Sequence, residues 1–512
     1  LRRYGGDLQG VLDKLDYLED LGVTALYFNP LNYAPSLHKF DAANYHHIDV
    51  NFGPDPKGDK LIIAQENPAD PTTWQWTSAD KLFLSLIKEL HQRNMKIIVD
   101  FSWNHTGIDF WAWKDVITNQ ENSDYADWYM IKQFNNPETE VNEFDYDGWL
   151  GYKSLPEFKK VDVVNREHGM PYEGNIHAEV RDHIYAVTER WLAPNGDVSA
   201  GIDGFRLDVA DQIPMGFWKE YRRKVKEINP EAYLVGEIWW KAFPDQLMDP
   251  RPYLGESAFD AIMFYQTYKP ARGFFGNNDD NLTASEFAER LVGETKDIPD
   301  HFLRAMMGLN ASHDTPRLLT SLDNSTIYKQ FSKPNDNPTY HAGKPSNEAY
   351  LRTKLYLLHQ FTSVPSPHIW NGDEMGMWGA DDPDNRKPLW WPELTFDNES
   401  SDEWQQEPRS YQVAFNNEHH SFYKQLIALR TSKESLQNGR FRILTATEHI
   451  FVYQRTHKGD RCIIAFNLSE DDQKVAGNKE LTNILFSVGG KSVVLDNGSI
   501  SLPPMSGVVV SK

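Results

Sequence analysis

The feature that most constrains this chain is a regular alternation of helical segments and short apolar runs. Each helical segment carries apolar residues at helical spacing, and a near-continuous apolar run follows it. The predicted helices are 8–20, 78–93, 177–192, 216–228, 284–297 and 347–361, and the predicted strands are 23–28, 96–101, 202–207, 233–238, 259–264, 302–309 and 367–370. Apolar strands that alternate with helices indicate a parallel sheet covered on both faces. About seven such strands over roughly 370 residues favour an α/β fold of the (β/α)8 TIM-barrel type over an open doubly wound sheet.

Two regions depart from this alternation. Residues 106–176 are polar, aromatic and irregular, and they predict a subdomain inserted in the loop after the strand at 96–101. Residues 433–512 alternate with a period of two, which predicts a C-terminal antiparallel β-sandwich domain. The predicted barrel therefore comprises residues 1–105 and 177–432.

The composition excludes several classes of protein. A net charge of −22 repels the phosphate backbone, so we expect no nucleic-acid partner. No apolar run reaches the length of about 18 residues that a membrane span needs. The single cysteine, Cys462, permits no disulfide within the chain. Because hydrophobic residues make up 40% of the chain, a large packed core is available instead.

Polar side chains follow four of the predicted strands at the point where each strand ends. These residues are Asp100, Asn104, His105, Arg206, Asp208, Glu237, His313 and Asp314. In TIM barrels, active sites lie at the carboxyl ends of the strands. Any one of these residues alone could serve a structural ion pair or a helix cap. Together, at successive strand ends, they predict a catalytic site.

The carboxylates in this set suit acid/base chemistry. Arg206 and Asp208 are two residues apart on a strand, so they share a face, and the arginine should keep Asp208 ionised as a nucleophile. Glu237 precedes Trp239 and Trp240, and an apolar wall should raise its pKa as a general acid requires. Two carboxylates with separated pKa values match glycoside hydrolysis.

Competing chemistries fit the sequence less well. The adjacent residues Ser312, His313 and Asp314 point to alternate faces of a strand, so they cannot line up as a hydrolase triad. Two pairs of adjacent histidines, His46-His47 and His419-His420, are candidate zinc ligands. Neither pair has a partner histidine or a carboxylate at the spacing of known zinc motifs, which predicts surface or substrate-contact roles.

Four motifs, taken in order, resemble those of the alpha-amylase family of glycoside hydrolases (family 13). The motifs are Asp100-Phe-Ser-Trp-Asn104-His105, Gly204-Phe-Arg206-Leu-Asp208, Gly236-Glu237-Ile-Trp239 and Ser312-His313-Asp314. The resemblance implies that the strand at 96–101 is the third of the barrel. The family's first strand lies upstream of a Gly-Gly-Asp-Leu segment that begins here at Gly5. We therefore expect either residues upstream of Leu1 or a gap in the barrel.

The resemblance also implies a role for each residue of the site. Asp208 would be the nucleophile, Glu237 the general acid/base, and Asp314 a transition-state stabiliser, with the carboxyls of Asp208 and Glu237 about 5–5.5 Å apart for a retaining mechanism. The implied substrate-binding residues are Tyr45, His105, Arg206, Trp239, His313, Asp382 and Arg386. Of these, Tyr45 would stack on the glucose at the cleavage point.

Four segments are similar to neopullulanases and cyclomaltodextrinases: 236–239, 259–263, 312–317 and 381–388. The resemblance implies a retaining hydrolase that cleaves α-1,4-glucosidic bonds of cyclodextrins, pullulan or maltooligosaccharides, with an α-glucan oligosaccharide as its partner. Two alternatives stay open. One is an α-glucanotransferase, transglycosylase or isomerase that uses the same site. The other is a non-catalytic glucan-binding protein.

Cofactor, compartment and assembly are less constrained. We expect no required cofactor and leave a calcium ion open, with Asn104 as a ligand; Lys159 and Lys160 stand near where an acidic ligand would be expected. A glycosylation sequon at Asn104-His-Thr106 lies inside the site motif, which favours a bacterial, non-glycosylating source, with the periplasm or cytoplasm as the expected compartment. The oligomeric state stays open.

Overall fold

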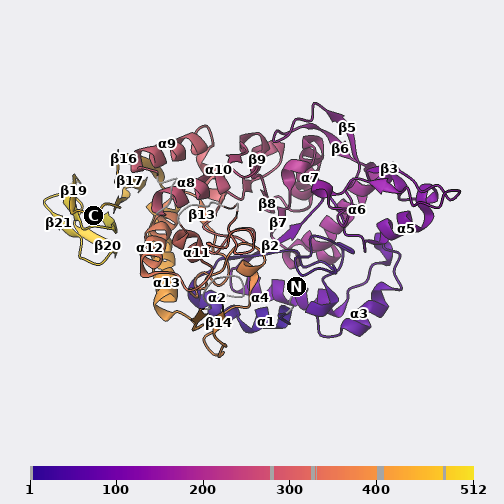
Figure 1. Cartoon of the computed structure of the whole chain (residues 1–512), viewed down its shortest axis with the longest axis horizontal. Helices are drawn as coiled ribbons and strands as arrows, with labels where there is room; N and C mark the ends of the chain where they lie inside the picture. Colours follow the sequence, from indigo (N-terminus) through magenta and orange to yellow (C-terminus); the bar gives the residue numbers. More distant parts are fainter. Residues whose placement is uncertain (1–3, 277–281, 325–328, 330, 401–408, 477–479) are drawn as a thin grey trace. The chain divides into compact units, whose positions relative to one another are not determined.

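A computed structural model of the chain describes residues 4–276, 282–324, 329, 331–400, 409–476 and 480–512. The chain forms two compact units (Figure 1). The first unit contains Leu1–Ala242 and Met248–Ile262, and the second contains Phe243–Leu247 and Met263–Lys512. Among the helices that the structure describes, none combines the length and the apolar character needed to cross a membrane.

The first unit is built on a parallel five-stranded sheet. Its strands, in spatial order, are β1 (Ala25–Phe28), β2 (Lys96–Phe101), β7 (Gly204–Leu207), β8 (Tyr233–Gly236) and β11 (Ala261–Ile262). The register sets Arg206 beside Asp100 on one side and beside Val235 on the other. The ladder continues beyond the strands, because Asp208 N donates to Phe101 O and Glu237 N donates to Leu207 O. The carboxyl ends of β2, β7 and β8 therefore lie side by side, as predicted.

The main helices of this unit outside the insertion are α1 (Leu8–Asp13), α2 (Leu15–Leu21), α3 (Pro56–Ile63), α4 (Ser78–Gln92), α6 (Ala178–Leu192) and α7 (Met215–Ile228). Phe205 of β7 packs against Tyr221 of α7, with ring centroids 6.1 Å apart. Because side chains alternate along a strand, this packing turns the neighbouring Arg206 to the opposite face.

The predicted insertion is irregular, as expected. It contains α5 (Trp111–Asn119) and two short antiparallel pairs, β3 (Ile131–Gln133) with β4 (Asp145–Tyr146) and β5 (Lys160–Val164) with β6 (Glu173–Ile176). A bridge between His105 and Glu157 joins the segment after β2 to this region.

In the second unit, a short parallel pair joins β12 (Met307–Gly308) to β13 (Ser366–Pro367), and Met263 bridges Met307. The helices of this unit are α8 (Tyr265–Phe275), α9 (Ala284–Thr295), α10 (Asp300–Ala305), α11 (Leu318–Asp323), α12 (Asn347–Thr362), α13 (Asn417–Ser432) and α14 (Glu434–Asn438). The predicted strand at 302–309 is wrong over its first half, where α10 lies. Pro299 caps this helix and Asp300 opens its first turn. A short apolar run does not distinguish a helix from a strand by periodicity.

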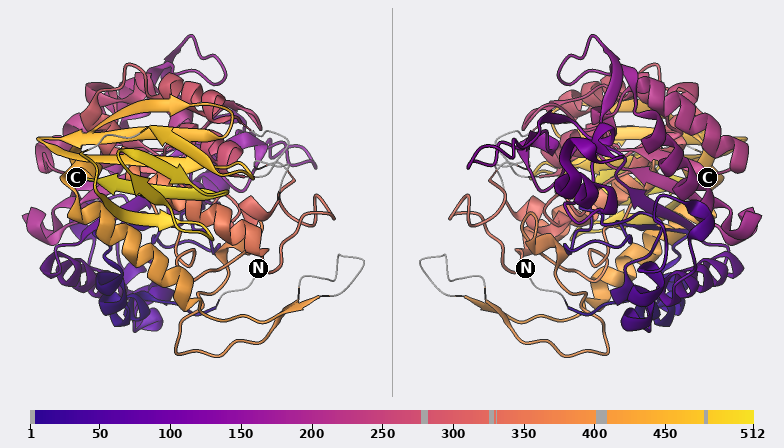
Figure 2. Two further views of the ribbon diagram at one scale, coloured as in Figure 1. Left: turned by 90° about the vertical axis from the view of Figure 1, so that its left-hand side faces the viewer. Right: turned by 90° about the vertical axis from the view of Figure 1, so that its right-hand side faces the viewer.

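The C-terminal residues form two antiparallel sheets (Figure 2). The larger sheet contains β16 (Arg440–Ala446), β17 (Ile450–His457), β18 (Asp460–Asn467), β23 (Ser506–Ser511) and β20 (Asn483–Val488), and the smaller contains β19 (Gln473–Ala476), β22 (Ser499–Leu502) and β21 (Val494–Asp496). Val452 of β17 and Ile500 of β22 belong to one apolar core shared by the two sheets. Phe451, on the other face of β17, packs on Phe287 of α9. The predicted antiparallel C-terminal domain is confirmed.

Candidate active site

In the first unit, one buried arginine joins three carboxylates. Arg206 Nη1 lies 2.6 Å from Asp208 Oδ1 and 3.1 Å from both carboxyl oxygens of Asp100. Its Nη2 lies 3.0 Å from Glu237 Oε2. The arginine side chain is 0% exposed. The sheet register explains the cluster, because the three carboxylates come from the ends of adjacent strands.

The groups of this cluster differ in whether their charge changes near neutral pH. Burial disfavours a charged guanidinium, yet Asp100 and Glu237 hold the pKa of Arg206 well above its ordinary value. Burial raises the pKa of Asp100 to about 7, although Arg206 and the Tyr27 hydroxyl both favour its carboxylate form. The Tyr27 hydroxyl donates to Asp100 Oδ2 at 2.6 Å. Arg206 therefore stays positively charged, and Asp100 helps to hold its side chain in place.

A strained residue links the two predicted catalytic carboxylates. Val209 follows Asp208 directly and adopts φ 40°, ψ 45°, in the left-handed region. For a β-branched residue this conformation costs on the order of 1–3 kcal/mol. It directs Val209 N–H toward Glu237 Oε2, at 3.0 Å. The turn after β7 therefore fixes Glu237 relative to Asp208, and this contact was not predicted from the sequence.

The surroundings of Glu237 differ from the predicted apolar wall. Trp239 is 6% exposed, and its ring stacks on Trp240 with centroids 4.7 Å apart. The contacts of the Glu237 carboxylate include a hydrogen bond from Val209 N and an ion pair with Arg206 Nη2. The acid role of Glu237 stays a prediction.

Lys160 lies at the position where the sequence left a calcium ion open, beside Asn104. Lys160 Nζ donates to Asn104 Oδ1 at 2.7 Å and lies 2.7 Å from Glu157 Oε2. The Lys160 side chain is 2% exposed. An ammonium that already occupies these oxygens leaves no donor set for a hard divalent ion. With Lys160 in this position, Asn104 and Glu157 do not fit a calcium ion.

His105 lies beside this lysine and is a neutral imidazole. It is 1% exposed, and its ring stacks on Trp149 with centroids 5.6 Å apart. Burial, together with the positive charge of Lys160 and the nearby His38, lowers the pKa of His105 to about 3. His105 can therefore offer a hydrogen bond to a sugar, but it carries no charge.

Tyr45 does not present a ring for stacking. It is 1% exposed, and its hydroxyl donates to Ser102 O at 2.8 Å and also to His105 O. The ring packs against Phe101, Trp103 and Phe110. The expectation that Tyr45 stacks on a sugar is wrong, because core side chains and backbone carbonyls already use the ring and the hydroxyl.

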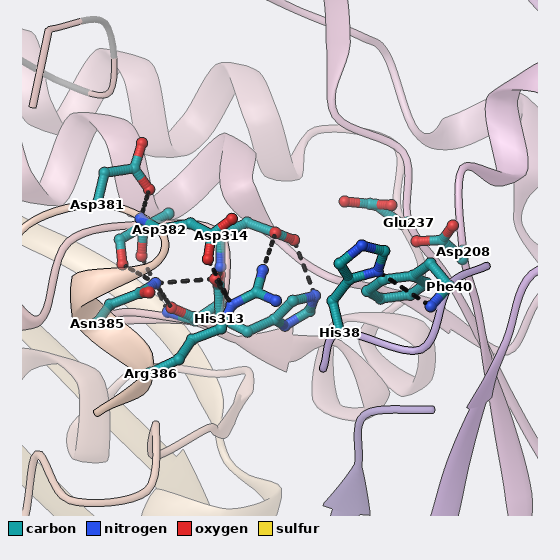
Figure 3. A network of polar contacts seen from close by, with 12 residues as sticks. His38, Phe40, Asp208, Glu237, His313, Asp314, Asp381, Asp382, Asn385 and Arg386 are labelled. Atoms are coloured by element: carbon teal, nitrogen blue, oxygen red, sulfur yellow. Dashed lines mark hydrogen bonds and ion pairs between the residues drawn. The ribbon is translucent and has the colours of Figure 1, made fainter. Parts of the chain in front are cut away.

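Two residues that were not predicted lie near the carboxylates instead. The half-buried Phe40 ring lies 5.9 Å from the guanidinium carbon of Arg206. Its backbone N–H donates to Nδ1 of His38, which is also half-buried (Figure 3). Both residues belong to the loop after β1, which ends at the same edge of the sheet as β2 and β7. The position of this loop was the available signal, because it too follows a parallel strand.

In the second unit, His313, Asp314, Asp382 and Arg386 form a connected network (Figure 3). Asp314 Oδ2 lies 2.9 Å from His313 Nε2, and Asp314 Oδ1 lies 3.3 Å from Arg386 Nη2. Arg386 Nε lies 3.0 Å from Asp382 Oδ1 and donates to His313 O at 3.0 Å. Burial would raise the pKa of Asp314, but His313, Lys329 and Arg386 outweigh it and hold the pKa well below its ordinary value. Asp314 is therefore a carboxylate held by cations.

An asparagine that was not predicted supports this network. Asn385 is 0% exposed, and its Nδ2 donates to Ser312 O at 3.2 Å, His313 O at 2.8 Å and Thr315 O at 2.9 Å. One amide therefore fixes the backbone that carries His313 and Asp314. Its sequence signal is weak, since it stands between charged residues in a loop.

Comparison with known proteins gives the family. The sequence profile described as alpha amylase, catalytic domain, matches residues 2–67 and 77–439. The chain belongs to the alpha-amylase family of glycoside hydrolases. It is 31% identical over 512 residues to a cyclomaltodextrinase of Geobacillus thermopakistaniensis, covering 98% of this chain and 69% of that protein. It is 32% identical to neopullulanase 2 of Thermoactinomyces vulgaris, covering 92% of this chain and 64% of that protein. The chain thus spans about two thirds of the length of these relatives.

Solved structures agree with the predicted fold class. A debranching enzyme from Nostoc punctiforme superposes with a TM-score of 0.73 at 26% identity, covering 100% of this chain and 90% of that one. A type III pullulan hydrolase from Thermococcus kodakarensis gives a TM-score of 0.71 at 25% identity, covering 99% and 72%. The family and these likenesses confirm the prediction of a TIM barrel with a C-terminal antiparallel domain.

Proposed function

We propose that this member of the alpha-amylase family is a retaining α-glucan hydrolase that cleaves α-1,4-glucosidic bonds of cyclodextrins, pullulan or maltooligosaccharides. The observation that carries the proposal is the single buried guanidinium that contacts both Asp208 and Glu237. Two carboxylates bound to one guanidinium are close together, as a retaining mechanism requires. The printed names of the relatives support the substrates, since they include a cyclomaltodextrinase and a neopullulanase.

In the proposed reaction, Asp208 attacks the anomeric carbon while Glu237 gives a proton to the departing glycosidic oxygen. This step forms a covalent glycosyl-enzyme, and Glu237 then takes a proton from the water that releases the sugar. Arg206 keeps Asp208 charged and correctly aimed. The net result is hydrolysis with the α configuration retained.

The second unit supplies the remaining residues of the proposed site. Asp314, His313 and Arg386 would bind sugar hydroxyls at the cleavage point and the next sugar, with Asp382 holding Arg386. Support comes from the cation-held carboxylate of Asp314 and from its connection through Arg386 to Asp382. That these residues meet Asp208 and Glu237 around one sugar is part of the proposal.

Asp208→Asn tests the proposal directly. Hydrolysis of β-cyclodextrin, pullulan and maltotriose should fall by about 10⁴-fold or more, since a nucleophile acts as one unit with its proton partner. Asp203→Asn, directly before β7 as Asp208 is directly after it, is the matched control, and both variants should keep the wild-type circular dichroism. Near-normal turnover by Asp208→Asn overturns the proposal, and so does a product released in the β configuration.

The stacked pair Trp239 and Trp240 favours a second candidate, transfer of the glycosyl group to another sugar. Trp240, which is half-buried and stacked on Trp239 close after Glu237, offers a flat ring surface to an acceptor sugar. Products longer than the substrate, dominating at low maltotriose concentration, would support transglycosylation. Glucose and maltose as the main products would support hydrolysis.

A further inference from the structure

A buried cluster of two histidines and two carboxylates lies in the first unit, apart from the residues assigned to the site. His47 Nε2 lies 2.8 Å from Glu66 Oε2, and His47 Nδ1 lies 2.7 Å from Asp80 Oδ2. His46 Nε2 lies 3.4 Å from the same Glu66 oxygen. All four side chains are 1% exposed or less. The expectation of a surface role for His46 and His47 is therefore wrong, and the alternative of a substrate contact stays a prediction.

His46 has unused ligand capacity. Within the described part of the chain, neither of its ring nitrogens has a hydrogen-bond partner. Its ring stacks on Trp74, with centroids 4.2 Å apart and planes at 11°. An unsatisfied buried nitrogen is costly, and here it lies next to a carboxylate and a second imidazole.

We propose that His46, His47 and Glu66 bind a divalent transition metal ion, with Zn²⁺ as the best match. Each residue offers one ligand atom, and these atoms lie within 4.8 Å of one another. Two imidazoles and one carboxylate are a donor set that suits zinc, with a water as the fourth ligand. Tetrahedral zinc with bonds of about 2.0–2.1 Å needs ligand atoms about 3.4 Å apart, so the two rings close slightly around the ion.

The proposed ligands His47 and Glu66 already have contacts that would orient them toward a metal ion. A ligating histidine usually gives its other ring N–H to a carboxylate, which fixes the ring and strengthens the ligand. Asp80 contacts His47 Nδ1 in this way, and the Asp80 carboxylate is itself held by Ile48 N at 2.8 Å and Thr77 N at 3.0 Å. Arg190 Nη2, 3.2 Å from Asp80 Oδ2, balances its charge. The Glu66 carboxylate accepts from Gln75 N.

The ligands come from two segments that a metal would join. His46 and His47 follow Tyr45, whose hydroxyl binds the backbone of the His105 segment, and Glu66 lies beyond the end of α3. A metal ion would therefore fasten the loop after β1 to the loop before α4. A ligand that binds only the folded chain raises its stability, by about 5 °C or more in Tm at a hundredfold excess over Kd.

The test uses the full chain without a polyhistidine tag, freed of metal by dialysis against a chelator. Titration with Co²⁺ should give visible absorption bands of tetrahedral cobalt that saturate at one equivalent, and Zn²⁺ should displace them and raise Tm. His46→Phe keeps the stack on Trp74 and should abolish both effects. His91→Phe is the matched control, because His91 Nε2 also lies 2.8 Å from a carboxylate, that of Asp203, but its Nδ1 contacts the backbone oxygen of Ser199.

Glu66→Gln provides a second variant in case His46→Phe does not fold, and circular dichroism identifies folded protein. The proposal is overturned if folded wild type takes up neither Co²⁺ nor Zn²⁺ in molar excess. It is also overturned if either folded variant binds the metal as wild type does. Because every readout is metal binding or Tm, the result is independent of the proposed hydrolysis.

Discussion

The two units hold their predicted site residues by different means. In the first unit, Arg206 is completely buried, and its carboxylate partners come from the adjacent ends of β2, β7 and β8. In the second unit, Arg386 is 15% exposed, and its partners lie on loops whose backbone is fixed by the amide of Asn385. Strand register therefore sets one cluster, and side-chain hydrogen bonds to loop backbone set the other.

This difference has energetic consequences. A buried cation shared by three carboxylates cannot be removed without leaving several buried charges unpaired. A partly exposed arginine in a loop network can be replaced partly by water. We therefore expect the first cluster to be intolerant of change and the second to be adjustable.

The largest expected effect separates the two arginines. Arg206→Lys replaces a planar fork by a point charge that cannot contact three carboxylates at once. We expect about 3 kcal/mol or more lost in the free energy of unfolding and about a 10³-fold fall in kcat/KM. Arg386→Lys should cost about tenfold in kcat/KM, chiefly through KM, with Tm nearly unchanged. Equal losses of both kcat/KM and Tm in the two variants would contradict the comparison.

The same contrast explains how much could be predicted from the sequence. Asp100, Arg206, Asp208 and Glu237 could be placed together, because periodicity identifies the strands and parallel strands end at one edge. The Val209 turn could not, since a left-handed valine contradicts local preference and is maintained only by its surroundings.

The positions of side chains on loops could not be predicted from the sequence in the same way. Tyr45 and Phe40 lie five residues apart in one loop, and only three-dimensional packing buries Tyr45 and leaves Phe40 near Arg206. The contact of Lys160 with Asn104 spans 56 residues, so no local pattern could reveal it. The family motifs did identify His313, Asp314, Asp382 and Arg386, but not Asn385, which supports their backbone.

The next effect tests whether the Asn385 amide positions the second cluster. Asn385→Ala removes one donor from each of three loop carbonyls, which should cost about 1–3 kcal/mol in the free energy of unfolding. Displacement of His313 and Asp314 should lower kcat/KM by about 10²-fold. The control is Asn337→Ala, a half-buried asparagine of the same unit. A lowered Tm with unchanged kcat/KM would show that Asn385 is only structural.

A smaller effect concerns the cation beside His105. Lys160→Met removes the ammonium from Asn104 and Glu157, and we expect about 2 kcal/mol lost in the free energy of unfolding, with a smaller change in kcat/KM. Lys159→Met is the matched control, because that neighbouring side chain is 38% exposed. Calcium added to metal-free wild type should leave Tm unchanged. A calcium-dependent rise in Tm would show that a divalent ion, not Lys160, belongs at these oxygens.

The last prediction concerns a pH dependence that comes from the buried cluster of the first unit. The pKa of Asp100 is raised from 3.8 to about 7 in the folded chain by burial, so the folded chain binds more protons than the unfolded chain between those values. The free energy of unfolding should therefore fall as pH rises through this window, by at most about 1.4 kcal/mol per pH unit from this group.

Asp100→Asn cannot titrate, so the difference in Tm between the variant and wild type should shift in favour of the variant from about pH 5 to 8. Asp70→Asn, at an exposed carboxyl whose pKa is lowered by hydrogen bonds from Thr72, should leave the profile over this range unchanged. Parallel profiles for wild type and Asp100→Asn would mean that Arg206 keeps Asp100 ionised throughout, and that the first cluster carries one more fixed negative charge than this comparison assigns to it.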